Sequence, residues 1–166
     1  MSRAKKRHEQ KIIDLLEIRK KCKQELGKLS KRDLWLLGLG IYLGEGSKSC
    51  EIIRVINANP KVIKLAVKWF KKICGLRNEN FSLRIHIYPD NDINDCIKFW
   101  SKTSGIPSKQ FKKTQIDKRI DKSIKKKNKL PYGTAHLIVK SNGNKDLGVK
   151  LHRKIIGWIE CVLEQI

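Results

Sequence analysis

The stretch Gly38-Leu39-Gly40-Ile41-Tyr42-Leu43-Gly44-Glu45-Gly46 decides the fold, because it combines an apolar helix with several glycines and one terminal carboxylate. A glycine inside a helix costs about 1 kcal/mol relative to alanine, so this composition needs a compensating contact. Gly40 and Gly44 are four residues apart and share one helix face, where the missing side chains let another backbone come close. The stretch therefore predicts a closely packed helix that ends by presenting Glu45.

The residues before this stretch mark where the helix begins. Ser30 and Asp33 form a capping-box pattern, in which each side chain accepts a hydrogen bond from the other residue's backbone N–H. The apolar run from Leu34 to Gly44 is too short to cross a bilayer, which needs about 20 residues. We expect a buried helix, and at this point Glu45 can equally be an ordinary solvated residue at its end.

The chain carries a large excess of positive charge. Lys and Arg number 38 against 16 Asp and Glu, which gives a formal net charge of +22 over 166 residues. Such a charge repels itself in the compact state, so a polyanion is the expected partner. We expect this partner to be nucleic acid and not a membrane. The hydrophobic content of 40% is enough for a globular core.

The amino terminus does not have the pattern of a secretion signal. Residues 1–7 are basic, but residues 9–11 are polar where a signal peptide has an apolar segment. The five cysteines are scattered and form no C-x-x-C pair, so neither zinc nor a disulfide framework is expected. We therefore expect a protein of the prokaryotic cytoplasm or of an organelle, not a secreted one.

A broken apolar stripe among many lysines predicts a helix over residues 5–29. This helix can be a basic arm that docks on a partner, or a solvated leader helix. We divide the chain into a basic helical arm, residues 1–29, and a second domain, residues 30–166.

A weak internal sequence repeat, with an offset of thirty residues, predicts two copies of a unit made of a strand, a polar turn and a helix. The first copy has a strand over residues 51–57 and a helix that Asn59 caps and that ends near Cys74. The second copy has a strand over residues 82–88 and a helix that ends near Ser104. Each copy closes with a glycine after its helix.

The remaining elements complete an α+β fold. Alternation predicts a strand over residues 134–140, and helical spacing predicts an amphipathic helix over residues 145–166. We expect a mixed or antiparallel sheet with its helices on one face.

The strands over residues 82–88 and 134–140 alternate between apolar and polar side chains. Cationic, hydrogen-bonding and aromatic groups therefore share one face, and a two-stranded ribbon of this kind fits the major groove of DNA. An ordinary half-exposed sheet gives the same pattern, and the net charge favours DNA contact. The candidate DNA-binding residues are Lys48, Arg54, Arg84, His86, Tyr88, His136 and Lys140.

A basic segment between Phe111 and Leu130 contains nine lysines and arginines against two aspartates. We expect a loop that follows phosphates, with Lys125, Lys126 and Lys127 as its contacts. A merely solvated loop is the alternative.

Glu45 stands out because acidic residues are scarce and the common catalytic motifs are absent. The sequence has no phosphate-binding loop of the G-x-x-x-x-G-K-[ST] type, and its four histidines lack metal-ligand spacing. One carboxylate is a weak Mg²⁺ site. Two chains packed through Gly40 and Gly44 would bring two copies of Glu45 together beside two scissile phosphates.

Residues 38–46, followed by Ser47, resemble the signature of the LAGLIDADG homing endonuclease family. Glycine stands at the third position as Gly40, a small residue at the seventh as Gly44, the acid at the eighth as Glu45 and glycine at the ninth as Gly46. The stretch Asn57-Ala58-Asn59-Pro60-Lys61 is similar to that family's N-x-D-P stretch.

The resemblance implies a saddle in which two signature helices pack through Gly40, Gly44 and Gly46 while sheets straddle the DNA major groove. A chain with one signature is implied to act as a homodimer on near-palindromic double-stranded DNA. Glu45 would bind a divalent metal, Mg²⁺, and the protein would hydrolyse one phosphodiester per chain. The candidate assisting residues are Gln110, Lys112, Lys113 and Gln115. The alternatives are a non-catalytic DNA- or RNA-binding regulator of the same fold and a structural RNA-binding protein.

Overall fold

The computed structural model describes residues 3–117 and 130–166, which divide into two compact units, Met1–Leu34 and Trp35–Ile166. Lys125, Lys126 and Lys127, the predicted phosphate contacts, lie outside the described residues. The first unit contains the helix α1 (Arg3–Leu26), which buries none of its residues.

The capping box predicted at the start of the glycine-rich helix is confirmed. The backbone N–H of Ser30 donates to Asp33 Oδ2 at 2.8 Å, and the backbone N–H of Asp33 donates to Ser30 Oγ at 3.1 Å. The helix that follows, α2 (Lys31–Glu45), ends at the predicted carboxylate.

The second unit is an α+β domain built on a four-stranded mixed sheet. The strand order is β1-β4-β2-β3, with antiparallel pairing of β4 to both β1 and β2 and parallel pairing of β2 to β3. The strands are β1 (Arg54–Asn57), β2 (Phe81–Ile87), β3 (Gln115–Ile116) and β4 (Thr134–Val139). Its other long helices are α3 (Pro60–Ile73), α4 (Ile93–Ser104) and α6 (Val149–Leu163). Short 3-10 turns occupy Asn78–Asn80, Ser108–Gln110 and Lys145–Leu147.

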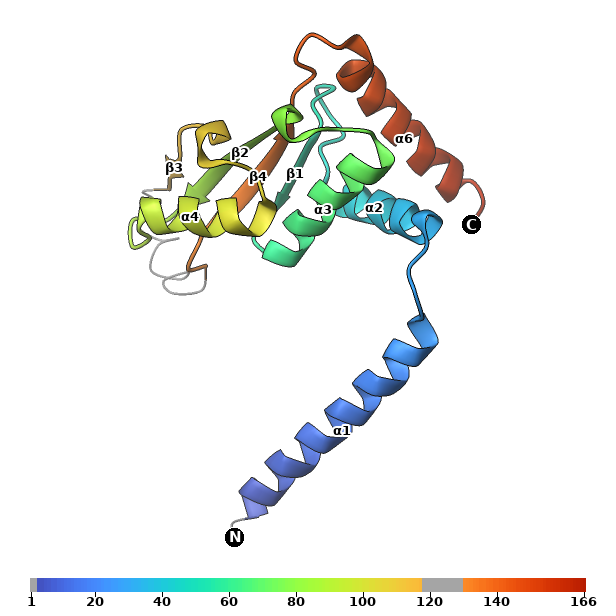
Figure 1. The fold of residues 1–166 in the computed structure, drawn as a ribbon, viewed down its shortest axis with the longest axis vertical. Coiled ribbons are helices and arrows are strands. Elements are labelled where there is room, and N and C mark those ends of the chain that lie inside the picture. Colours follow the sequence, from blue (N-terminus) through green and yellow to red (C-terminus); the bar gives the residue numbers. More distant parts are fainter. Residues whose placement is uncertain (1–2, 118–129) are drawn as a thin grey trace. The chain divides into compact units, whose positions relative to one another are not determined.

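The helices α3 and α4 lie side by side over one face of this sheet (Figure 1). Their position confirms the predicted pair of strand, turn and helix. Asn59 caps α3 by accepting from the backbone N–H of Lys61 at 2.9 Å, and Gly105 ends α4 in the left-handed region at φ 71°.

Alternate residues of β2 form the centre of the hydrophobic core. The side chains of β2 that face α3 and α4 are at most 1% exposed, and they are Phe81, Leu83, Ile85 and Ile87. Their spacing confirms the predicted period of two. The fully buried rings of Trp100 and Phe70 complete this layer from the helices. Each such side chain contributes about 1.5–3 kcal/mol on burial, so the sheet is held firmly on this side.

The helix α2 packs against α3 through a glycine. A Cβ atom on Gly38 would lie 1.9 Å from Trp69 Cδ1, so only glycine leaves room for the indole ring. The Trp69 Nε1–H donates to the Trp35 carbonyl at 3.1 Å, and the Trp35 ring in turn meets Trp158 of α6 edge to face at 5.3 Å. In the described residues, no helix combines the length and apolar character needed to cross a membrane.

Candidate nucleic-acid interface

The sheet face opposite α3 and α4 gathers most of the predicted polar residues. Strand pairing places Arg84 beside His136 and His86 beside Thr134, while Gln115 of β3 pairs with His86 from the other side. Arg54 of β1 belongs to the same face. We name this surface the polar sheet face, and it consists of Arg54, Arg84, His86, Gln115, Thr134 and His136.

Three side-chain nitrogens on the polar sheet face are shielded from solvent without a hydrogen-bond partner in the described protein. They are the Nε atoms of Arg54 and Arg84 and Nε2 of His86. An arginine Nε–H is always a donor, and a buried donor without an acceptor costs about 1–3 kcal/mol, so native proteins leave few of them. The Arg54 and Arg84 side chains are nevertheless partly exposed, so this face presents guanidinium groups at the surface of the sheet.

The two histidines of this face form a stacked pair. Their ring centroids are 3.8 Å apart with the planes inclined by 20°. Burial, then the neighbouring His86 and the Arg54 and Arg84 charges, lowers the pKa of His136 to about 4. Burial and the Arg84 charge also lower the pKa of His86. At neutral pH the imidazoles are uncharged, so the two arginines provide the positive charge of the face.

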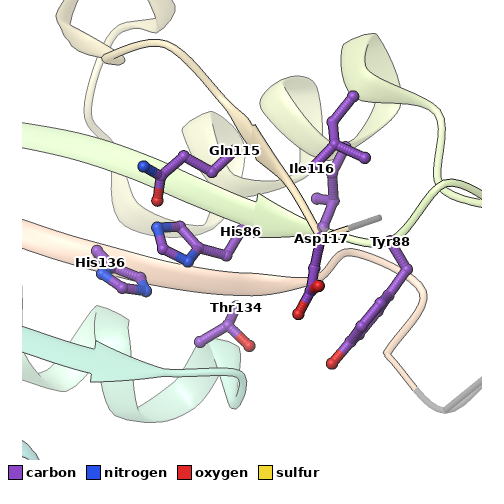
Figure 2. A pocket seen from close by; sticks show the side chains of 8 residues that line it. His86, Tyr88, Gln115, Ile116, Asp117, Thr134 and His136 are labelled. Carbon is purple, nitrogen blue, oxygen red and sulfur yellow. The ribbon is translucent and has the colours of Figure 1, made fainter. Parts of the chain in front are cut away.

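A hollow of about 540 Å³ lies where β2, β3 and β4 meet. Figure 2 shows the histidine pair on one side of it, with Tyr88 and Asp117 on the other. Tyr88, a predicted contact residue, thus lines the same surface as His86 and His136. Lys140 directly follows β4. Its backbone N–H donates to the Asn80 carbonyl, and its own carbonyl accepts from Asn80 Nδ2.

The segment after Glu45 is fixed by a pair of buried side chains, which we name the Ser47 clamp. The Tyr42 hydroxyl donates to the Ser47 carbonyl at 2.9 Å, and His152 Nε2 lies 3.2 Å from the same oxygen. Burial raises the pKa of Tyr42 to about 12, so its hydroxyl stays a donor. The backbone N–H of Ser47 also donates to the Arg54 carbonyl at 2.8 Å, which joins this segment to β1.

The sequence did not single out Tyr42 and His152 as functional, although they hold the segment after Glu45 in place. Gly46 belongs to the same arrangement, because a Cβ atom there would lie 2.4 Å from the Tyr42 carbonyl oxygen. Gly46 is therefore required within the chain and is buried, unlike Gly40 and Gly44.

Glu45 itself is exposed at the end of α2. No group of three or more His, Cys, Asp or Glu side chains that could hold a metal ion forms within residues 3–117 and 130–166. Close by, Lys48 Nζ donates to the Leu43 carbonyl and so places a cation at the carboxyl end of the helix. Mg²⁺ needs an octahedral set of oxygens, so the described residues of one chain do not fit this ion.

The predicted assisting residues lie at the far edge of the sheet from Glu45. Backbone pairing between neighbouring strands forms one continuous row across the sheet. The row starts at Gly46, crosses β1, β4 and β2, and ends at Phe111. Four steps between neighbouring strands span about 19 Å, so Lys112 and Lys113 do not meet Glu45 within a chain. The Gln110 side chain holds the backbone in place, because its Nε2 donates to the Asn78 and Phe81 carbonyls at 2.9 and 3.0 Å.

One face of α2 is apolar and is left uncovered by the part of the chain that the structure describes. Leu36, Leu37 and Leu43 are 40%, 44% and 42% exposed. Between them, a Cβ atom on Gly40 or Gly44 would meet nothing within 4 Å. We name these five residues the open α2 face.

Comparison with protein-family models, curated proteins and solved structures gives no match for this chain.

Proposed function

We propose that the protein binds double-stranded DNA through the polar sheet face, with the sheet in the major groove. The observation that carries this proposal is the pair of partly exposed arginines, Arg54 and Arg84, whose Nε atoms have no hydrogen-bond partner among the described residues. Guanine offers two acceptors, O6 and N7, in the major groove, and arginine can bind both at once. The net charge of +22 supports a polyanionic partner of this kind.

The neutral histidine pair suits base edges better than phosphates. An uncharged imidazole both donates and accepts, whereas phosphate oxygens only accept. The stacked rings of His86 and His136 fix each other's orientation between two arginines. This arrangement supports sequence-specific contact and not only general attraction to the backbone.

We propose that the binding species is a homodimer paired through the open α2 face. Its leucines leave apolar area in water, and Gly40 and Gly44 leave room for a second backbone. Two copies related by a twofold axis would read a near-palindromic site in a saddle-like arrangement.

Binding is tested with Arg54→Gln/Arg84→Gln on a randomised 20-bp duplex library. The matched control is Arg77→Gln/Arg153→Gln, because these exposed arginines are ion-paired to Glu79 and Glu51 away from the polar sheet face. We expect the first variant to lose at least tenfold in affinity and the control to lose less than threefold. Equal affinities for the two variants would refute the role of the polar sheet face.

Cleavage of the bound duplex is a second candidate, favoured by the position of Glu45. The Ser47 clamp holds the residues just after it, at the end of the open α2 face. In the proposed dimer, two copies of Glu45 with phosphate oxygens and water would supply Mg²⁺ ligands that one chain lacks. With Mg²⁺ and the selected duplex, nicks that vanish in Glu45→Gln support cleavage. Tight binding without nicks in either protein leaves the non-catalytic regulator.

A further inference from the structure

Five lysines surround a hollow between α3 and α4, on the side of these helices away from the sheet. The hollow measures about 390 Å³ and is closed by Thr103, Ser104 and Gly105 at the end of α4. We name it the lysine groove, and its lysines are Lys64, Lys68, Lys71, Lys72 and Lys102. It lies on the opposite side of the domain from the polar sheet face, since α3 and α4 cover the other face of the sheet (Figure 1).

The charge of the lysine groove is not compensated by any of the described residues. No carboxylate lines it, and none of its five ammonium groups has an ion-pair partner in residues 3–117 and 130–166. Elsewhere on α4, by contrast, Lys98 Nζ lies 3.7 Å from Asp95. Like charges four residues apart on a helix, as in Lys64 and Lys68, are mutually destabilising.

Helix-dipole compensation does not account for this cluster. Cations stabilise only the last turn of a helix, which here explains Lys71, Lys72 and Lys102. Lys64 and Lys68 lie one to two turns earlier on α3, where the dipole offers them nothing. The full stripe from Lys64 to Lys72 extends about 12 Å along the helix, enough to contact about two or three consecutive phosphates of one strand.

We propose that the lysine groove binds the sugar-phosphate backbone of a second nucleic-acid segment, independently of its sequence. Lysine ammonium groups act as compact point charges, which suits phosphates and not base edges. With the polar sheet face on the other side of the domain, one protein then joins two nucleic-acid segments. Binding in the lysine groove does not itself require the polar sheet face, whereas the joining of two segments by one protein rests on the proposed function of that face.

The test is a bridging assay with the full chain. A biotinylated 20-bp duplex on beads captures the protein, and a labelled second probe, either a 20-bp duplex or a 20-nucleotide RNA, is added. The variant is Lys64→Gln/Lys68→Gln/Lys72→Gln, whose three side chains are exposed. The matched control is Lys61→Gln/Lys109→Gln/Lys145→Gln, three exposed lysines that do not line the groove.

We expect the groove variant to retain at least tenfold less labelled probe than wild type and the control. The better-retained probe shows whether DNA or RNA is the second segment. Because each lost phosphate contact removes about 0.9 from the salt slope on duplex DNA, the wild-type advantage on the duplex probe should shrink as the salt concentration rises from about 50 to about 200 mM. Equal retention by both triple variants would overturn the proposal. So would a variant that loses only binding to phosphatidylserine vesicles.

The two proposals fail separately in this assay. If Arg54→Gln/Arg84→Gln is captured and bridges as well as wild type, the polar sheet face is refuted while the lysine groove stands. If the groove variant bridges normally, the lysine groove is refuted and the polar sheet face is unaffected.

Discussion

The double substitution Gly40→Ala/Gly44→Ala should stabilise the monomer and weaken the dimer at the same time. Within one chain, a Cβ atom at either position meets nothing within 4 Å. Replacing an exposed helical glycine with alanine gains up to about 1 kcal/mol, with less near a helix end, so the monomer should gain about 1–2 kcal/mol. In the proposed dimer, the same methyl groups occupy the space needed by the second backbone.

The two effects are separated by measuring both on the same protein. Urea unfolding at low concentration reports the stability of the monomer, and sedimentation velocity over a concentration series reports the dimer. We expect a dissociation constant at least tenfold higher, which is about 1.4 kcal/mol. The control Gly38→Ala places its Cβ against Trp69 and should destabilise the fold without touching the open α2 face. A dimer as strong as that of wild type would refute the argument from the two exposed glycines.

Two further predictions concern the Ser47 clamp and the histidine pair. Tyr42→Phe removes one hydrogen bond to the Ser47 carbonyl and should lower the free energy of unfolding by about 1 kcal/mol. The control Tyr132→Phe changes a more exposed ring and should alter the free energy of unfolding little. Urea titration measures both values. The folded pKa of His136, about 4, lies below the unfolded value of 6.5, so its stabilising contribution is complete above pH 6.5 and is lost as the pH falls toward 4. After solvent screening we expect a loss of about 2 kcal/mol that is absent in His136→Gln, and parallel pH profiles for the two proteins would contradict this.

The sequence predicted most of the fold because its signals are local. The alternation of β2 has the period of a strand, and the caps at Ser30 and Asn59 are set by residues two or three positions away. Arg84, His86, Thr134 and His136 of the polar sheet face follow from the same alternation. Gln115 does not, because the sequence predicted it as an assisting residue beside Glu45.

Contacts between residues far apart in the sequence determine which helical glycine packs closely and where the predicted assisting residues lie. The three helical glycines are alike in sequence, but only Gly38 meets an indole ring, from a residue 31 positions later. The Ser47 clamp depends on His152, 105 residues along the chain. Strand order likewise placed Gln110 and Lys112 at the edge of the sheet far from Glu45, a result that spacing along the chain could not provide.

The unpaired nitrogens of Arg54 and Arg84 were also beyond the reach of the sequence. The sequence predicted both arginines as DNA contacts, but not that they would share one face or that each Nε would lack a partner among the described residues. That feature appears only when neighbouring strands pack around each side chain.

Selection of binding sites from a randomised duplex library tests the central claim most directly. Wild type should enrich a near-palindromic motif, because a homodimer presents the polar sheet face twice. Arg84→Gln should lose base preference at one position in each half-site, with the rest of the motif retained. No enriched motif with wild type, or an unchanged motif with Arg84→Gln, would contradict sequence-specific DNA binding through this face.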